Sequence, residues 1–163
     1  MRTFIAITLA SPELDLYKQQ LKQPGITPTR HNHITLQFLG DISQKQLADV
    51  QEKLATITFK PFTLITTCLD QFSQHPNILW LGVKSKELTL LQKNIQEILP
   101  SSLTLEKIFR PHITLARVKI KHWKNTEHSP PQLTVLIDKF LLYTSMLGQR
   151  GPSYTIISTY PLH

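Results

Sequence analysis

The chain has 163 residues, of which 40% are hydrophobic, which is enough for one compact domain or for two small lobes that share a core. Lys and Arg number 18 against 11 acidic residues, so the formal charge is +7 and the pI is near 9.6. This balance favours a polyanionic partner, with nucleic acid first. Cys68 is the only cysteine, which excludes an intrachain disulfide and a cysteine metal cluster.

No apolar run in the sequence is long enough to span a membrane. Met1 and Arg2 precede a short apolar stretch that contains two threonines, and a first β-strand explains this stretch better than a signal peptide does. We therefore expect a cytoplasmic protein with no membrane partner. The pattern indicates no obligate protein partner, so a monomer is expected.

Strand-type and helix-type patterns alternate along the chain. Capping residues and apolar residues at helical spacing indicate helices, as where Ser43 precedes Leu47, Val50 and Leu54. We expect helices over about 12–22, 44–57 and 86–99, and strands over about 2–9, 33–39, 62–72, 78–83, 112–118, 133–147 and 154–162. Loops are expected over 26–32, which carries Pro28, and over 119–131.

The tetrapeptide His-Ile-Thr-Leu occurs twice, at His33 to Leu36 and at His112 to Leu115, about half the chain apart. Each copy continues into an apolar run, and strand and helix types recur in each half in a similar order. This repetition suggests an internal duplication, with the motif strands facing each other across a pseudo-two-fold axis. The outcome would be a single domain, residues 1–163, with an α+β architecture and a central cleft.

Alternation along a β-strand decides which side chains each motif presents. In the first copy, strict alternation gives one face with His33, Thr35 and Gln37 and a core face with Ile34, Leu36 and Phe38. In the second copy, His112 and Thr114 share a face. Arg117 falls on the opposite face unless a bulge or the strand end redirects it.

Two imidazoles are a chemically useful pair. A lone His-x-Thr on a strand is usually a half-buried pair of side chains, whereas two identical copies favour a shared site. With reference pKa values of about 6.5, one imidazole can act as base and the other as acid near neutral pH. In-line displacement at phosphorus needs such groups on opposite sides, and Thr35 and Thr114 would donate hydrogen bonds to non-bridging oxygens. No metal is required when a histidine protonates a sugar-hydroxyl leaving group.

Segments along the whole chain match a known family. They are Arg2 to Ala6, His33 to Gly40, Leu79 to Val83 and Phe109 to Arg117, followed by Leu142, Ser145, Gly151, Pro152 and Tyr154. With its paired His-x-Thr motifs, the sequence resembles the 2H phosphoesterase superfamily, and most closely its RNA 2′,3′-cyclic phosphodiesterase branch, once called 2′-5′ RNA ligases. The resemblance implies a bilobal duplicated fold in which two antiparallel sheets line a central cleft and helices lie outside.

The resemblance also implies an activity. Enzymes of this family open a 2′,3′-cyclic phosphate to a 2′-phosphomonoester without a metal or another cofactor, and 2′-5′ RNA ligation is the reverse reaction. By motif position, His33 would be the proton donor and His112 the proton acceptor, an order that the residues themselves leave open. The expected partner is RNA, or a nucleotide, with a 2′,3′-cyclic phosphate end.

Phosphate or substrate contacts are assigned to four further side chains, Thr35, Thr114, Arg117 and Arg110. Trp80 is expected in the core rather than as a platform for a base. His31 lies two residues before His33, but with no carboxylate nearby and no cysteine cluster we expect no zinc site.

The sequence departs from the family at Gly25 and Ile26, where members often carry an Arg-Trp pair before the first motif. Arg30 is a candidate substitute, and the preferred RNA stays open. The basic loop with Lys119, Lys121 and Lys124 either touches an RNA backbone or is solvated surface.

Two other functions also stay open. One is an RNA-binding module of the same fold without catalysis. The other is a related enzyme that acts on another cyclic phosphate or on a 2′-5′ oligonucleotide. The presence of both histidines and both threonines favours the enzyme, because phosphate binding alone would not need two imidazoles.

Overall fold

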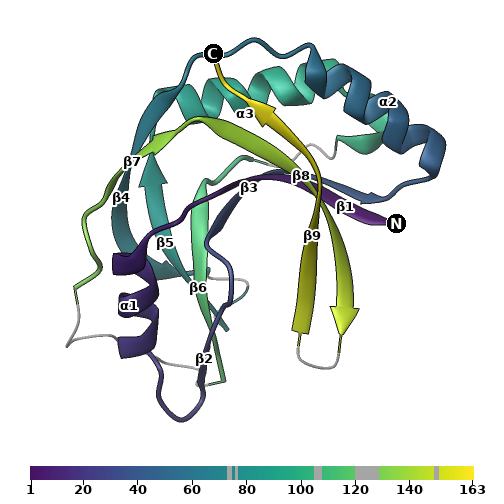
Figure 1. Ribbon diagram of the computed structural model, residues 1–163. Coiled ribbons are helices and arrows are strands. Elements are labelled where there is room, and N and C mark those ends of the chain that lie inside the picture. The colour runs from purple at the N-terminus through teal and green to yellow at the C-terminus, as the bar shows by residue number, and fades with distance from the viewer. Residues whose placement is uncertain (73–74, 76, 105–107, 120–128, 149–150) are drawn as a thin grey trace.

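The computed structural model describes residues 1–72, 75, 77–104, 108–119, 129–148 and 151–163, and Figure 1 shows how they are arranged. In chain order the elements are β1 (Arg2–Thr8), α1 (Pro12–Gln20), β2 (Ile26–Pro28), β3 (His33–Asp41), α2 (Gln44–Ala55), β4 (Phe62–Gln71), β5 (Ile78–Lys84), α3 (Lys86–Ile98), η1 (Ser101–Leu103), β6 (His112–Val118), β7 (Thr134–Ile137), β8 (Lys139–Gly148) and β9 (Gly151–Pro161). Among these residues, no helix is long and apolar enough to cross a membrane.

Two antiparallel sheets make up the fold, with strand orders β3-β1-β8-β9 and β2-β6-β5-β4-β7. The first sheet joins the two ends of the chain, so that purple β1 lies beside the yellow-green β8, and β9 lies on the other side of β8 (Figure 1). The second sheet is built mainly from the middle of the chain. The predicted α+β class with two antiparallel sheets is therefore confirmed.

The two sheets share one arrangement around the motif strands. Without β2, the orders are β3-β1-β8-β9 and β6-β5-β4-β7, so each motif strand bounds a row of strands. In both rows a strand and then a helix precede the motif strand in the chain, and that earlier strand pairs with it. This arrangement supports the predicted duplication, although each sheet takes strands from both halves of the chain.

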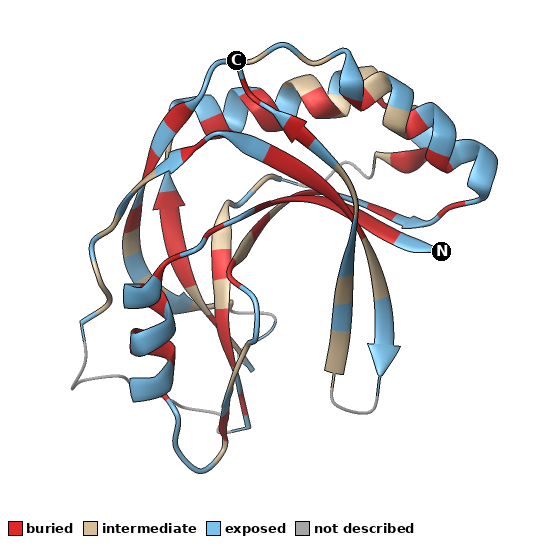
Figure 2. Ribbon diagram, viewed as in Figure 1, coloured by how far each residue is buried: buried red, intermediate tan, exposed pale blue. Residues whose placement is uncertain are grey.

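One continuous core joins the two sheets. Ile5 and Ile34 from the first sheet and Leu79 and Leu81 from the second belong to a single cluster of fully buried side chains. Helices α2 and α3 lie along the top of the molecule and α1 lies beside the second sheet (Figure 1), and Figure 2 shows exposed residues on the outer sides of α1 and α2. Burial of each large aliphatic side chain stabilises the fold by about 1.5–3 kcal/mol.

Each α-helix of the described chain begins after a serine, and the caps at Ser11 and Ser43 were predicted from the sequence. The side chains of Ser11, Ser43 and Ser85 each accept a hydrogen bond from the backbone N–H three residues later. Ser43 also forms a capping box with Gln46. These caps fix where the helices start, and hence where the strands that follow them can run.

Some segments differ from the prediction. The predicted strand 133–147 is interrupted at Asp138, where the chain changes sheets: β7 pairs with β4, whereas β8 pairs with β1 and β9. One straight strand cannot serve two sheets, so the backbone breaks between them. Part of the predicted loop 26–32 forms β2, an edge strand in which Pro28 is tolerated because it has no neighbour on its outer side. Strand β3 also extends past Leu39 to Asp41.

Candidate active site

The two motif strands lie against each other, although they belong to different sheets. His33 is the first residue of β3 and His112 is the first residue of β6. Burial is the main cause of the lowered pKa of His33, and the charges of His31 and His112 lower it further, so the two motif histidines share one electrostatic environment. The structure therefore brings together two histidines that lie about half the chain apart in the sequence.

The first motif strand carries a β-bulge at Leu36. Two successive residues of β1 pair with Gln37 and Thr35, so the leucine between them has no opposite residue. An extra residue reverses the alternation of side chains beyond it. Leu36 and Gln37 are accordingly both buried, and Phe38 emerges on the face of His33.

The bulge overturns the predicted faces of two residues. Gln37 was expected beside the histidine, but it is buried and its amide donates to the carbonyl oxygens of Phe38 at 3.0 Å and Leu103 at 3.5 Å. Phe38 was expected in the core, but it is 59% exposed. Its ring centroid lies 6.1 Å from that of Phe4, and Phe4 lies 5.6 Å from His33.

The second motif strand carries the same bulge at Leu115. Two successive residues of β5 pair with Ala116 and Thr114, and the leucine between them again has no opposite residue. Leu115 and Ala116 are fully buried, and Arg117 after them is exposed. Strict alternation would place Arg117 on the face opposite His112. Because the bulge reverses the alternation, Arg117 lies on the same face as His112.

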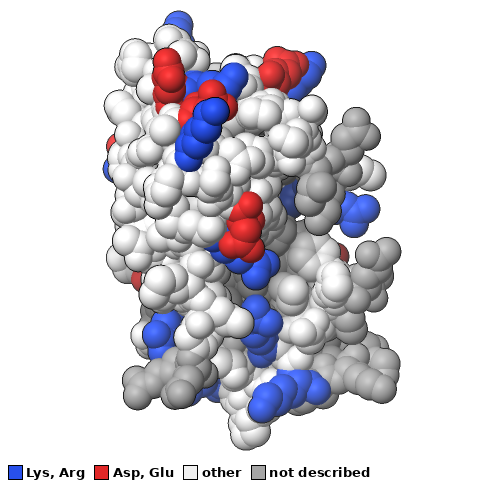
Figure 3. Space-filling view, turned by 90° about the vertical axis from the view of Figure 1, so that its right-hand side faces the viewer, with Lys and Arg blue, Asp and Glu red and all other residues white. Residues whose placement is uncertain are grey.

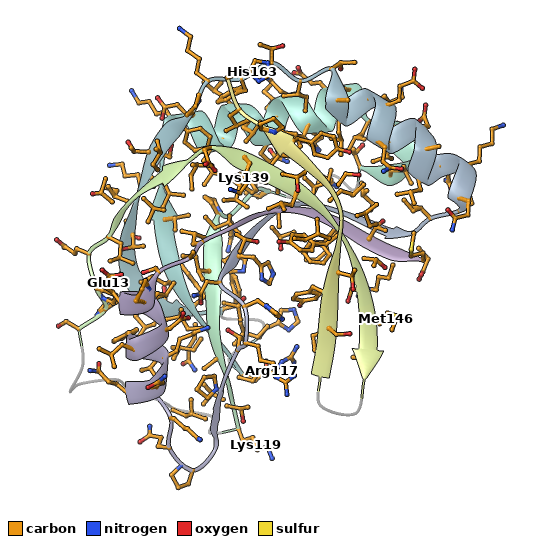
Figure 4. All side chains as sticks on the ribbon, in the orientation of Figure 1. Glu13, Arg117, Lys119, Lys139, Met146 and His163 are labelled. Atoms are coloured by element: carbon orange, nitrogen blue, oxygen red, sulfur yellow. The ribbon has the colours of Figure 1, made fainter. Side chains whose placement is uncertain are left out.

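Arg117 projects from β6 toward the β8–β9 hairpin, as Figure 4 shows. Its positive charge acts on Tyr154 of β9, where it opposes the rise in the pKa of the phenol that burial causes. Arg117 and Phe38 occupy the same position in the two motifs, five residues after the histidine. The duplicated strands thus place a cation at this position of the second motif and an exposed aromatic ring at the same position of the first.

The ring of His112 is oriented by the residue two positions before it. Its Nδ1 lies 2.7 Å from the carbonyl oxygen of Arg110. A carbonyl oxygen can only accept, so Nδ1 carries the hydrogen and Nε2 of the neutral ring keeps its lone pair. Burial lowers the pKa of His112, and this hydrogen bond raises it in part. Arg110 therefore acts on the site through its backbone, and the exposed residue lines the same cavity as His112.

His33 is the more strongly perturbed of the two rings. Burial, followed by the charges of His31, His112 and Lys18, lowers its pKa to about 4. Its Nδ1 is buried, and among the described residues it has no hydrogen-bond partner. A protonated imidazole has two N–H donors, so this buried nitrogen also disfavours the charged form. In the unliganded protein His33 is therefore neutral at pH 7.

Thr35 and Thr114 are the second residues after the two histidines and lie on the same faces as them. Both are partly exposed, as are the histidines. Within the described part of the chain, neither hydroxyl is held by a hydrogen bond to another residue. Both hydroxyls are thus available to donate to an oxyanion bound between the two rings.

Aromatic rings form a wall beside His33. Phe4 stacks on Tyr143 at 5.1 Å, and Tyr154 meets Phe4 at 5.0 Å and His33 at 5.3 Å. His31 is exposed, and its ring centroid lies 5.2 Å from that of Tyr154. This wall was not predicted from the sequence, because its members come from three strands that only the sheet order brings side by side.

A cavity of about 490 Å³ lies beside His112. Its lining residues are Thr67, Cys68, Asp70, Phe72, Trp80, Gly82, Val83, Phe109, Arg110, Pro111 and His112. Trp80 was expected in the core, but it is only partly buried and lines this cavity. The strand register explains this position. Trp80 lies opposite Thr114 in the sheet, so its side chain is on the same face as Thr114 and His112.

One part of the surface carries basic side chains without acidic neighbours. In Figure 3, Lys and Arg lie alone in the lower part of the face shown, whereas in the upper part they lie among Asp and Glu. In the described ranges, no group of three or more His, Cys, Asp and Glu side chains is arranged to hold a metal ion. Lys119 is exposed just after β6, whereas Lys121 and Lys124 fall outside the described residues.

Comparison with known proteins adds a family. Residues 10–143 match the family described as the 2′-5′ RNA ligase superfamily. A relative from Archaeoglobus fulgidus named RNA 2′,3′-cyclic phosphodiesterase is 29% identical, over 94% of this chain and 96% of its own. A relative of the same name from Aquifex aeolicus is 30% identical, over 80% of this chain and 77% of its own.

Solved structures share the fold. A Thermus thermophilus protein superposes with a TM-score of 0.86 at 23% identity, covering 99% of this chain and 98% of that one. E. coli LigT in complex with 3′-AMP superposes with a TM-score of 0.85 at 24% identity, covering 99% and 97% of the two chains.

Proposed function

Because this chain belongs to the 2′-5′ RNA ligase superfamily, we propose that it is an RNA 2′,3′-cyclic phosphodiesterase. The observation that carries the proposal is the pair of identical bulged strands that direct His33 and His112 into one environment. Relatives that align with most of the chain bear this name. One continuous core spans both sheets, which supports treating residues 1–163 as one catalytic domain.

In the proposed reaction, water attacks phosphorus while the bond from phosphorus to the ribose O3′ breaks. His112 accepts the proton of the water at Nε2, and His33 donates a proton to O3′. The product is a 2′-phosphomonoester with a free 3′-hydroxyl, so atoms and charge balance. The hydrogen bond from Nδ1 of His112 to the carbonyl of Arg110 supports the base role, because it leaves the Nε2 lone pair free.

The acid role of His33 depends on the substrate. Its pKa of about 4 in the free protein leaves the ring neutral at pH 7. A phosphate anion within about 4–6 Å of an imidazole favours the protonated form, and binding of the cyclic phosphate therefore supplies the charge that raises this pKa. Proton uptake and substrate binding are then coupled, and the site is charged only when it holds its substrate.

The remaining side chains of the site bind the phosphate and the nucleoside. Thr35 and Thr114 donate to the non-bridging oxygens, where negative charge builds up in the transition state. The guanidinium of Arg117 neutralises that charge from the side of the second motif, and Arg110 adds a second guanidinium at the rim. The exposed ring of Phe38 offers the base of the terminal nucleotide a surface to stack on.

Product analysis tests this proposal. The protein is incubated with a nucleoside 2′,3′-cyclic phosphate in a chelator, and the 2′- and 3′-phosphomonoesters are separated. Accumulation of the 2′-isomer at an unchanged rate in chelator is expected. A 3′-isomer would reverse the geometry of the leaving group, and the absence of turnover would favour an RNA-binding module without catalysis. Dependence on an added divalent ion would reject the two-histidine mechanism.

A further inference from the structure

The cavity beside His112 is larger than hydrolysis requires. On the side of the phosphorus where His112 acts, the proposed reaction needs room for one attacking water, and a water occupies about 30 Å³ in the liquid. The cavity measures about 490 Å³. Phe38 and the wall of Phe4, Tyr143 and Tyr154 lie beside His33, in the other motif. This space is therefore not accounted for by the terminal nucleoside.

The walls of the cavity are aromatic and are built as a stack. Phe72 and Trp80 lie with ring centroids 5.2 Å apart and planes at 26°. Both rings also contact His112 edge-on, at 4.9 Å and 6.0 Å. Phe109 adds a third aromatic ring to the lining. Flat rings that line an open cavity next to a phosphate site suit a nucleobase, because each base presents a flat π-face.

Gly82 leaves room for the side chain of Thr67 in the lining of the cavity. A Cβ atom at this position would lie 2.3 Å from the side-chain oxygen of Thr67, so no larger residue fits without displacing that side chain. Thr67 is turned toward Gly82 by an irregularity in the pairing of β4 with β5. Thr67 and Asp70 add hydrogen-bonding oxygens to the aromatic lining. Such a mixture of flat apolar walls and a few polar groups is typical of small-ligand sites.

We propose that this cavity is a second nucleobase subsite, in which a base stacks on the Phe72–Trp80 pair beside His112. The proposal rests on the proposed function. Two sources can supply such a base: the nucleotide before the cyclic end of the same RNA, or a separate nucleoside whose 5′-hydroxyl replaces water. In the second case the 5′-oxygen bonds to phosphorus, the bond to O3′ breaks, and the hydroxyl proton passes to His112 while O3′ gains one.

The test compares substrates in Phe72→Leu and Trp80→Leu, with Phe59→Leu as the matched control. Phe59 also sits in an aromatic pair, with Phe62, but at the opposite end of β4. The first arm measures KM for a cyclic mononucleotide and for a dinucleotide with a cyclic end. Loss of stacking should raise the ratio of dinucleotide to mononucleotide KM by roughly 5- to 100-fold. Because Phe72 and Trp80 also contact His112, a substitution could alter catalysis on both substrates alike, and the ratio of the two KM values cancels such a shared effect.

The second arm adds adenosine in excess and measures the yield of the 2′-5′ dinucleoside monophosphate relative to hydrolysis. A yield that falls in Phe72→Leu and Trp80→Leu, but not in Phe59→Leu, assigns the subsite to the incoming nucleoside. A change in the KM ratio assigns it to the preceding nucleotide. If both arms match wild type in both variants, the subsite does not exist.

A binding measurement separates this proposal from the proposed function. Trp80 and Trp123 are the two tryptophans of the chain, so a Trp123→Phe background isolates the emission of Trp80. A dinucleotide ending in a 2′-phosphate, or adenosine, should quench this emission, and a mononucleotide 2′-phosphate should do so far less. Quenching without turnover would keep the subsite and reject the enzyme. Turnover with no quenching by either ligand would keep the enzyme and reject the subsite.

Discussion

The hydroxyl of Thr29 donates a hydrogen bond of 2.8 Å to the backbone carbonyl of Thr114. The backbone N–H of Thr29 donates to the carbonyl of Leu115 at 2.8 Å. The segment before the first motif is therefore hydrogen-bonded to the bulge of the second motif strand. From the other side, the buried Nζ of Lys18 in α1 donates to the carbonyl of Thr29 at 2.8 Å. These bonds continue the pairing of β2 with β6 and hold the segment that leads into β3 against the second motif strand.

Removing the Thr29 hydroxyl should therefore impair catalysis more than binding. Thr29→Val keeps the shape and loses the donor, and a catalytic group displaced by about 1 Å can cost up to roughly 100-fold in rate. We expect kcat on a cyclic mononucleotide to fall about tenfold with little change in KM, and Thr29→Ser to restore it. Thr27→Val, two residues earlier on β2, is the control. An unchanged kcat in Thr29→Val, or an equal loss in the control, would reject this positioning role.

Replacement of either histidine by alanine should lower kcat by roughly two to four orders of magnitude, which is the usual contribution of general acid–base catalysis. Folding should be little affected, because both rings are partly exposed. Steady-state kinetics with thermal melts as a folding control would measure this. Turnover near wild type in either variant would remove that histidine from the mechanism.

The roles of the two histidines can be separated with a leaving group that needs no proton. On an aryl phosphodiester that releases a stable phenolate, His33→Ala should keep most of its activity if His33 is the acid. His112→Ala should remain inactive on the same ester, because its water is not activated. The reverse pattern would exchange the two roles.

The pKa of His33 predicts a pH dependence of stability. The ring has a pKa of about 4 in the folded protein, whereas the ordinary pKa of histidine is 6.5. Between these values the unfolded chain binds a proton that the folded chain does not, so the free energy of unfolding falls as pH is lowered through this window. Urea unfolding at pH 7 and pH 5 should show a smaller loss for His33→Asn than for wild type. Equal losses would mean that the ring is not held neutral.

The sequence located both histidines and the fold class because identical motifs and helix caps are local signals. It failed at Phe38, Gln37 and Trp80, since each depends on pairing register. The position of the bulge cannot be predicted from the run Thr35 to Leu39, because every residue after the threonine is compatible with a regular strand. The burial of Lys18 was likewise not predictable, because its partner Thr29 is fixed only by tertiary contact with β6.

The shared position of Phe38 and Arg117 predicts distinct losses. Arg117→Met removes a charged hydrogen-bond donor, a change worth about 1.5–3 kcal/mol, so kcat/KM should fall roughly 10- to 100-fold for every cyclic nucleotide. Phe38→Leu removes a stacking surface and should raise KM more for purine than for pyrimidine cyclic nucleotides. Kinetics on the four mononucleotides measure both effects. A uniform loss in Phe38→Leu would argue against base stacking at this ring.

Salt dependence should distinguish binding of the cyclic phosphate from binding of the RNA behind it. The formal charge of +7 and the basic side chains on the lower face in Figure 3 suggest that further phosphates contribute to binding. Lys119 lies beyond Arg117 toward the lower end of β6 in Figure 4, and its N–H donates to the carbonyl of Gly25 at 2.7 Å. Contacts between lysines and phosphates release counterions, so they weaken as salt rises.

A longer RNA with a cyclic end should therefore show a KM that climbs with salt, and a cyclic mononucleotide should show much less change. Replacing Lys119, Lys121 and Lys124 by glutamine should flatten the slope for RNA and spare turnover of the mononucleotide. KM against salt concentration, for both substrates in wild type and triple variant, measures this. Equal slopes for the two substrates in wild type would mean that the terminal phosphate alone is bound. An unchanged RNA slope in the triple variant would move the RNA contacts to other basic residues of the cleft, Arg110 and Arg117 first.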